Sequence, residues 1–181
     1  MDAYNKGLTE VALARMEACA RNGDPVACYL AAVWCSNGEG AKPDSERAQQ
    51  WLIQLEQLAQ GGDLEAQWEI GQHYRFGDLL PLDIARANYW LERAAEAGYP
   101  EAQHHLAWFV ETGQYGYPVD QKTSESWYQR AFEQRHPETL YRFAIRQLRE
   151  AQTRDEAIAL LREAAERGFS QAAELLRSIL H

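Results

Sequence analysis

The chain has 181 residues, of which 46% are hydrophobic and 25% are charged, a balance that excludes general disorder and allows a sizeable core. Its formal net charge of −9 disfavours both general nucleic-acid binding and docking on an anionic membrane, because each of these needs a basic face. No stretch approaches the roughly eighteen consecutive apolar residues of a membrane span.

The first residues of the chain carry no basic segment followed by an apolar one, so they do not resemble a secretory signal peptide. We therefore expect the protein in the cytoplasm. Helical periodicity begins with residues 8–21, which we predict as a lone leading helix. Cys19, Cys28 and Cys35 are odd in number and too sparse for a disulfide framework. In a reducing compartment we expect all three to be buried thiols.

One short sequence motif, here called a phrase, ends in Ala or Thr and recurs along the chain. Such recurrence is typical of a helical repeat array. The final residues of its five copies are spaced by 39, 36, 37 and 33 positions. A second phrase lies between the copies of the first and places an N-cap type of residue seven positions before a large apolar residue. The final residues of the first phrase are Ala27, Ala66, Ala102, Thr139 and Ala172, and the second phrase joins Asp44 to Trp51, Asp83 to Trp90, Asp120 to Trp127 and Thr153 to Leu160.

The residues of these phrases predict where helices begin and end. An oxygen of Asp44, Asp83, Asp120 or Thr153 accepts from an amide of the first turn, which makes each of them a predicted N-cap. Glycines suit the left-handed residue at a helix C-terminus, and proline suits the first turn, where an amide is not needed. The predicted terminal glycines are Gly62, Gly98 and Gly168, and Asp24-Pro25 and Asp63 open the helices that follow.

Each repeat is therefore predicted to contain a helix A, a loop and a helix B. The first helix B is nearly one turn longer than the others, the third loop is one residue longer, and the fourth unit should turn tightly near Gln152. Such units bury their apolar faces only by stacking, so we expect one continuous domain over residues 1–181. In chain order, the helices A are 24–36, 63–76, 100–112 and 137–149, the helices B are 44–60, 83–97, 120–134 and 153–167, a capping helix is 170–180, and the units are 24–62, 63–98, 99–136 and 137–168.

This pattern resembles the Sel1-like repeat family, a relative of the tetratricopeptide repeats, over roughly residues 8–172. The resemblance implies an all-α, right-handed α/α superhelix with a concave face. It also implies adaptor, scaffold or partner-binding roles, mostly without catalysis, and some bacterial members resemble immunity proteins that neutralise toxins. The second unit carries the pattern best, with Ala66, Ile70-Gly71, Tyr74, Gly77, Asp83, Arg86-Ala87, Trp90 and the segment 94–98.

The resemblance also offers an alternative for two of the cysteines. Cysteine-rich secreted members of the family have a disulfide at a junction like the one that Cys19 and Cys28 flank. The alternative to free thiols is therefore a disulfide between these two residues.

The candidate partner-binding residues share equivalent positions of the helices A, which stacking would align on the concave face. Trp and Tyr dominate interfaces, so aromatic residues at these positions point to a protein or peptide partner. Packing between neighbouring helices A is the alternative role for the same positions. Counted from the aligned Ala or Thr, the third position holds Tyr29, Trp68, His104 and Tyr141, the seventh Val33, Gln72, Trp108 and Ile145, and the eighth Trp34, His73, Phe109 and Arg146.

Three arginines, Arg142, Arg146 and Arg149, lie on neighbouring turns of the last helix A, and Arg135 precedes it. They could hold an acidic segment through bidentate contacts. The alternative is pairing with nearby acidic residues such as Glu138 and Glu150.

No motif of a phosphate-binding loop, a nucleophile elbow or a zinc protease is present. His104 and His105 are adjacent and so point about 100° apart on a helix, and His73 lies in a different row. Nothing in the spacing supports Cys28 and His73 as a nucleophile and its base. We therefore expect no catalytic group, no metal ligands and no cofactor.

These patterns predict a non-catalytic adaptor or scaffold that binds a protein or peptide on its helix-A face. The alternatives are an immunity-type inhibitor of a bacterial toxin and, more remotely, an enzyme or metal protein. Residues 130–181 carry nine Arg and eight acidic residues, which leaves the rest of the chain strongly acidic. An acidic body favours a basic partner. Neither the partner's identity nor the oligomeric state follows from the sequence.

Overall fold

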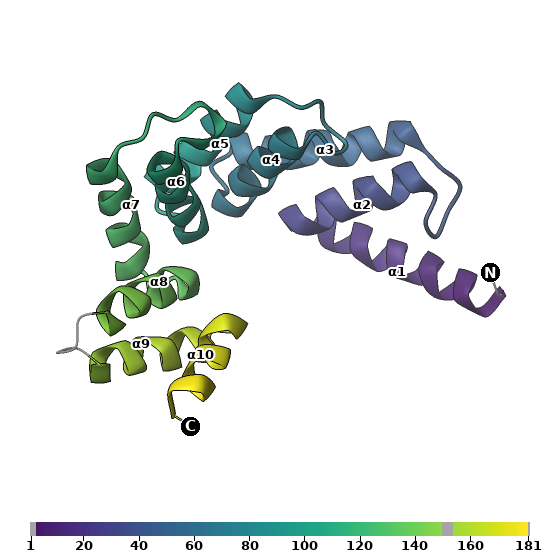
Figure 1. Cartoon of the computed structure of the whole chain (residues 1–181). Coiled ribbons are helices and arrows are strands. Elements are labelled where there is room, and N and C mark those ends of the chain that lie inside the picture. Colours follow the sequence, from purple (N-terminus) through teal and green to yellow (C-terminus); the bar gives the residue numbers. More distant parts are fainter. Residues whose placement is uncertain (1–2, 150–153, 181) are drawn as a thin grey trace. The chain divides into compact units, whose positions relative to one another are not determined.

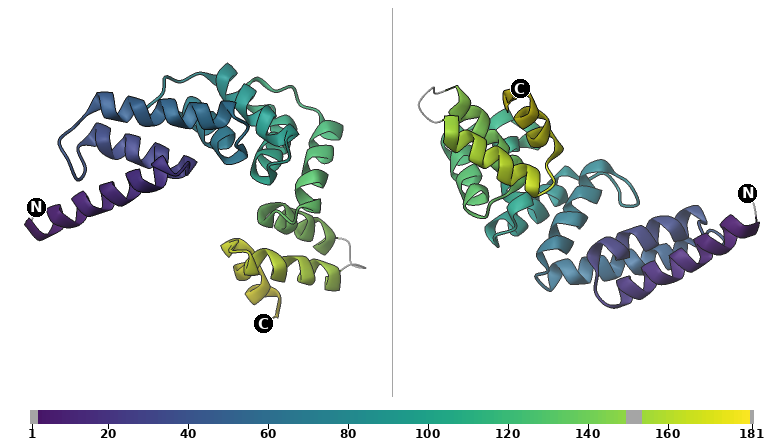
Figure 2. Two further views of the ribbon diagram at one scale, coloured as in Figure 1. Left: turned by 180° about the vertical axis from the view of Figure 1, so that it is seen from behind. Right: turned by 90° about the horizontal axis from the view of Figure 1, so that it is seen from below.

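The computed structural model describes residues 3–149 and 154–180 (Figure 1). All regular structure in these residues is helical, with no strand, and none of their helices is long and apolar enough to cross a membrane. The chain divides into two compact units, Met1–Ala97 (unit 1) and Gly98–His181 (unit 2). Within each unit, each helix A lies beside the helix B that follows it, and the two form a helix-turn-helix hairpin (Figures 1 and 2).

The helices follow the predicted order of alternating A and B elements. Unit 1 contains α1 (Ala3–Arg21), α2 (Pro25–Asn37), α3 (Ser45–Gln60), α4 (Leu64–Phe76) and α5 (Ile84–Glu96). Unit 2 contains α6 (Pro100–Thr112), the 3-10 turn η1 (Gln114–Gly116), α7 (Gln121–Glu133), α8 (Pro137–Leu148), α9 (Arg154–Glu166) and α10 (Ser170–Leu180).

The predicted bounds are confirmed to within about a residue for the helices that lie wholly in the described ranges, except for the leading helix. That helix begins at Ala3, five residues before the predicted start. The predicted extra turn is present, because α3 has 16 residues whereas α5 has 13. The longer third loop forms η1, in which Tyr115 adopts a positive φ of 53°. The expected cap Thr153 and the turn near Gln152 lie outside the described residues.

Carboxylate caps start helices α2 to α5 of unit 1. Asp24 and Asp63 each accept from an amide of the first turn at 2.8 Å, and Asp44 and Asp83 do so at 2.9 and 3.0 Å. In unit 2, Asp120 caps α7 in the same way. These caps confirm the prediction from the repeated phrases.

The helix C-termini also follow the prediction. Gly62, Gly98 and Gly168 have φ values of 96°, 104° and 94°, a conformation that costs glycine little. The fourth phrase has no glycine, and there Arg135 adopts a φ of 60°. This residue is held by an ion pair with Glu163.

Small side chains let the helices of each hairpin approach closely. At Gly71 of α4, an added Cβ would lie 3.3 Å from the Ala87 carbonyl oxygen and from the Trp90 Cβ of α5. In unit 1 the core combines alanines with Leu55 and Ile70. In unit 2 it combines alanines with Leu140, Leu160 and Leu161 of α8 and α9.

A buried carboxylate ties three helices of unit 1 together. Glu17 of α1 is 3% exposed and accepts hydrogen bonds from Arg47, from the Trp51 indole and from the Cys35 thiol. Because these donors come from α2 and α3, the charge of Glu17 is compensated where the helices meet.

The three cysteines are free thiols, so the alternative of a disulfide between Cys19 and Cys28 is wrong. Cys28 and Cys35 are buried as predicted, and burial raises the pKa of Cys28 to about 11. The prediction that Cys19 is buried is also wrong, because it lies on the exposed face of α1. The Cys28 thiol instead donates to the Ala20 carbonyl at 3.7 Å inside the core.

Candidate functional site

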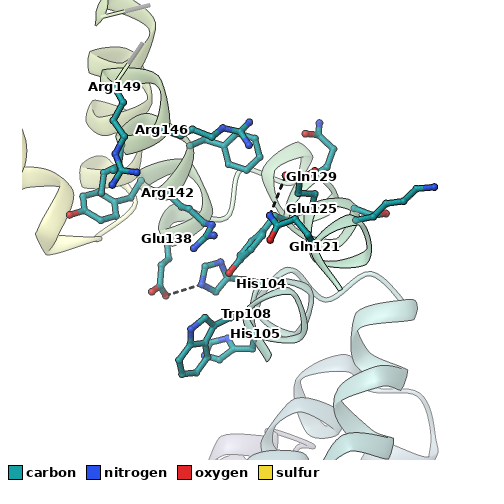
Figure 3. A pocket seen from close by; sticks show the side chains of 16 residues that line it. His104, His105, Trp108, Gln121, Glu125, Gln129, Glu138, Arg142, Arg146 and Arg149 are labelled. Atoms are coloured by element: carbon teal, nitrogen blue, oxygen red, sulfur yellow. Dashed lines mark hydrogen bonds and ion pairs between the residues drawn. The ribbon is translucent and has the colours of Figure 1, made fainter. Parts of the chain in front are cut away.

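A cavity of about 1000 Å³ opens among α6, α7 and α8 of unit 2 (Figure 3). We call it the α6–α8 groove. Aromatic and basic side chains from the three helices dominate its lining. Its main lining residues are His104, His105 and Trp108 of α6, Lys122, Glu125 and Tyr128 of α7, Glu138, Tyr141, Arg142 and Arg146 of α8, and Arg149, the C-cap residue of α8.

One buried histidine of the groove lining, His104, shares the Thr139 hydroxyl with a second buried histidine, His136. The Nδ1 atoms of His104 and His136 lie 2.8 and 3.0 Å from the hydroxyl oxygen of Thr139. His136 is the N-cap of α8 and also accepts from the Thr139 amide at 3.4 Å. Burial, together with the nearby His104, lowers the pKa of His136 to about 4. His136 is therefore neutral at neutral pH, as its capping role requires.

His104 also faces the carboxylate at the edge of the groove. Its Nε2 lies 3.5 Å from Glu138 of α8 (Figure 3). Hydrogen bonding to His104 lowers the pKa of Glu138. This carboxylate is thus engaged by α6 rather than by the arginines of its own helix.

One wall is fixed by a clasp of Glu111, Tyr128 and Arg142, which come from α6, α7 and α8. The Tyr128 hydroxyl donates to Glu111 at 3.1 Å, and burial raises the pKa of this hydroxyl. Arg142 pairs with the same carboxylate, and its guanidinium carbon lies 4.2 Å from the Tyr128 ring centroid. Arg142 therefore follows the alternative of pairing with a nearby acidic residue, with Glu111 on the neighbouring helix A as its partner in place of Glu138.

The mouth of the groove carries exposed cationic and aromatic side chains. Arg146 and Arg149 are exposed, and within the described ranges neither forms an ion pair with a carboxylate. The guanidinium carbon of Arg146 lies 4.7 Å from the Phe143 ring centroid. Trp108 is 39% exposed, and Tyr141 is half-buried beside Phe169. These groups offer contact area and charge to a ligand in the same small space.

The groove brings together predicted candidates from two of the predicted helices A. They are His104, Trp108, Tyr141, Arg142, Ile145, Arg146 and Arg149. Sequence reasoning did not identify the contribution of the helix B between them. Lys122, Glu125 and Tyr128 of α7 line the groove, but the candidate positions were counted along the helices A alone. Tyr128 follows the Trp of the repeated phrase, and no sequence signal marked it as a lining residue.

The candidates of unit 1 lie in different surroundings. The rings of Tyr29 in α2 and His73 in α4 stack with centroids 3.3 Å apart and an interplanar angle of 11°. His73 is 6% exposed and lies 3.6 Å from both Glu69 and Asp78. This stack joins α2 to α4, which is the packing role that was the alternative for these positions.

The other candidates of unit 1 are half-buried. Trp34 packs against a cluster that contains Leu13 and Cys35. Gln72 accepts a hydrogen bond from Arg75 at 2.6 Å, and Trp68 is also half-buried. These residues therefore keep part of their surface open to solvent.

The repeat register explains why the two units differ. The third position of one helix A meets the eighth position of the next, which gives Tyr29 with His73 in unit 1. In unit 2 the equivalent positions hold His104 and Arg146, which do not stack and instead both line the groove. The groove therefore opens where an aromatic pair is replaced by a histidine and a long cation.

The described residues contain no group of three or more His, Cys, Asp or Glu side chains arranged to hold a metal ion. Unit 1 has a smaller cavity of about 410 Å³, lined mostly by apolar residues such as Leu52, Ile53, Leu79 and Leu80.

Comparisons with known proteins agree with the repeat pattern. The family model of the Sel1 repeat matches residues 25–58, 64–99, 100–136 and 154–169. A crystal structure of a Sel1 repeat protein from Oxalobacter formigenes is 33% identical, with a TM-score of 0.60, over 70% of this chain and 97% of that one. The fourth unit is matched only from its helix B onward, in keeping with its missing loop glycines.

Two further relatives are longer than this chain. The crystal structure of c5321, a protective antigen of uropathogenic Escherichia coli with an SLR fold, is 24% identical, with a TM-score of 0.61. The match covers 91% of this chain and 35% of that one, and it concerns the fold alone. An uncharacterized protein of Neisseria meningitidis serogroup B is 33% identical over 129 residues, which are 71% of this chain and a quarter (25%) of that protein's length.

Proposed function

The chain belongs to the Sel1 repeat family, whose members generally mediate protein–protein interactions, and we propose that it is a non-catalytic adaptor or scaffold. It binds a protein or peptide segment in the α6–α8 groove. The observation that carries this proposal is the groove itself, where Trp108, Tyr141 and three arginines from a rigid helical frame surround one cavity. Large aromatic and arginine side chains are the residues that dominate binding energy in protein interfaces.

The construction of the groove favours a polypeptide ligand. Part of its lining is fixed by the hydrogen bonds of His104 and by the clasp of Glu111, Tyr128 and Arg142. A preformed surface of this kind loses little conformational entropy on binding. The arginine-lined side is exposed, so a segment of a larger protein can enter without being enclosed.

The candidates of unit 1 have secondary roles in this proposal. Trp68, Gln72 and Trp34 keep part of their surface exposed and are available to extend the contact. Tyr29 and His73 are assigned to the packing of α2 against α4, because their rings stack on one another.

Site-specific photocrosslinking tests where the partner binds. Benzoylphenylalanine replaces Trp108 in one protein and Tyr89 in the other, and each is irradiated in a lysate of the source organism. Tyr89 of α5 is the matched control, since it is 51% exposed and lies outside the groove. We expect a single partner protein from the lysate to be crosslinked to position 108 and not to position 89. Equal crosslinking from both positions, or crosslinking from position 89 alone, would overturn the proposal.

A second candidate role is an immunity-type inhibitor of a bacterial toxin. The charge of unit 1 favours it, because Met1–Ala97 contains 15 acidic and eight basic residues. Such a surface attracts a basic protein. A basic toxin crosslinked from exposed positions of unit 1, and inactivated by the purified chain, would favour this role over the adaptor. We propose the cytoplasm as the compartment for either role, since Cys28 and Cys35 are buried free thiols.

A further inference from the structure

The exposed arginines at the mouth of the α6–α8 groove differ in their pairing from several other arginines of unit 2, which form ion pairs with carboxylates. Arg135 and Arg167 both pair with Glu163, and Arg142 pairs with Glu111. Arg146 of α8 and Arg149, the C-cap residue of the same helix, are exposed and have no carboxylate partner in the parts of the chain that the structure describes. Among the described residues, therefore, no carboxylate neutralises these two guanidinium groups, and the alternative partner Glu150 lies outside those residues.

The acidic side chains of the groove are already engaged. Glu138 interacts with His104, and Glu125 accepts a hydrogen bond from the Gln121 side chain at 3.3 Å (Figure 3). The lining also contains Lys122 and Arg142, so four basic residues face two acidic ones. The groove is therefore locally basic on a chain whose net charge is −9.

Charge complementarity selects the ligand. We propose that the α6–α8 groove binds an acidic peptide segment of a partner protein, with carboxylates held by Arg146 and Arg149 and a neighbouring apolar side chain packed on Trp108. This inference rests on the proposed function, because it names the chemistry of the segment that the same groove takes. Planar guanidinium groups bind carboxylates in bidentate geometry, which gives direction as well as attraction.

A nucleic acid fits these observations less well. Its backbone would require a basic face that runs beyond two side chains. Unit 2 instead contains 12 acidic and ten basic residues, and only four of its basic residues line the groove.

Selection from a random-peptide library is the first part of the test. The purified full chain is the target, and the selected sequences are compared with the starting library. We expect enrichment of peptides with two or more Asp or Glu residues next to an apolar or aromatic residue. Enrichment of basic or uncharged peptides, or no enrichment, would overturn the inference.

Matched variants locate the binding. Fluorescence anisotropy measures the Kd of a selected acidic peptide for the chain, for an Arg146→Gln/Arg149→Gln variant and for an Arg162→Gln/Arg177→Gln control. Arg162 and Arg177 are exposed on α9 and α10 and lie outside the groove, so the control has the same change in charge. We expect the Kd to rise about tenfold or more in the groove variant and less than about twofold in the control. Circular dichroism spectra of all three proteins check that they fold alike.

The outcomes separate this inference from the proposed function. Equal losses in both variants would overturn the inference, because the attraction would then be a general effect of charge. If the selected peptides are basic or uncharged but bind the Trp108→Ala variant more weakly than the unchanged chain, the inference is overturned and the groove remains the binding site. If the Kd of the selected peptides changes neither in the Arg146→Gln/Arg149→Gln variant nor in Trp108→Ala, both proposals are overturned. Tighter binding of single-stranded DNA than of acidic peptide at Arg146 and Arg149 would also contradict the choice of a peptide.

Discussion

Units 1 and 2 are built from the same repeat but use equivalent positions differently. In unit 1, the third and eighth positions of neighbouring helices A form the stack of Tyr29 on His73. In unit 2, the same positions hold His104 and Arg146, and a cavity of about 1000 Å³ lies among their helices. The comparison teaches that the repeat fixes where side chains meet, whereas the identity of two residues decides whether that place is closed or open.

The two units also differ in charge. Unit 1 has seven more acidic than basic residues and unit 2 only two more. The buried carboxylate Glu17 of unit 1 is compensated by Arg47, whereas Arg146 and Arg149 of unit 2 lie at a groove mouth and have no carboxylate partner among the described residues. The repeat frame is therefore shared, and the difference in charge lies in the side chains that the frame presents.

The comparison depends on the two units being separate structural bodies, and core truncations test this with the largest expected effect. Leu55→Ala in unit 1 and Leu161→Ala in unit 2 each remove a fully buried side chain. We expect each to cost about 3 kcal/mol of unfolding free energy, because a cavity remains. Native-state hydrogen exchange should show that each variant weakens chiefly the helices of its own unit. Equal weakening of both units by both variants would show instead that they unfold together.

Acid should affect unit 2 through its buried histidine. The pKa of His136 is lowered from 6.5 to about 4, so its neutral form stabilises the folded state above pH 6.5, and that contribution is lost as the pH falls towards 4. Allowing for partial solvent screening, we expect the loss to be about 2 kcal/mol.

Urea unfolding at neutral pH and near pH 4 measures this loss. The matched variant is His136→Asn, since Asn also caps helices but does not titrate in this range. The pH dependence of stability should be smaller in the variant by about the predicted amount. An identical pH dependence in the two proteins would contradict the burial of a neutral His136.

Removing one ring from each unit sharpens the contrast between packing and binding. Tyr29→Leu loses the stack with His73 and should cost about 1 kcal/mol of stability without changing the affinity for a groove ligand. Tyr141→Leu, in the groove, should lower the affinity with a similar or smaller cost in stability. Urea unfolding and peptide anisotropy measure the two effects. A loss of affinity in Tyr29→Leu alone would reverse the roles of the two units.

The smallest expected effect concerns the clasp. Glu111→Gln keeps an acceptor for Tyr128 but removes the charge that holds Arg142. We expect a stability loss of about 0.5 kcal/mol, because the pair is partly exposed. The released Arg142 should tighten acidic-peptide binding about threefold, since a third guanidinium becomes available. Glu166→Gln on α9 makes the same change in charge outside the groove. An equal gain in that control would attribute the effect to net charge.

The fold was predictable in detail because local chemistry encodes it. Asp44 and Asp83 cap the first turns of helices, and Gly62 and Gly98 adopt the positive φ that follows a helix C-terminus. Both effects depend only on residues that are close in sequence. Equivalent positions such as Tyr29 and His104 could likewise be aligned by counting along the repeat.

The state of those positions could not be predicted from the sequence alone. Whether Tyr29 is covered depends on the ring of His73, 44 residues later, and the partner of Arg142 is Glu111, on another helix. The contribution of α7 to the groove was missed for the same reason, because Tyr128 reaches the cavity only when three helices have packed. Contacts between helices thus decide the site, whereas contacts within helices decide the fold.

Hydrogen–deuterium exchange of the chain with and without its crosslinked partner, or a selected peptide, tests the central claim most directly. The predicted result is slower exchange in residues 100–112 and 137–148, which form α6 and α8, with little change in residues 25–37 and 64–76 of α2 and α4. Slower exchange confined to α2 and α4, with α6 and α8 unchanged, would contradict the assignment of binding to the α6–α8 groove.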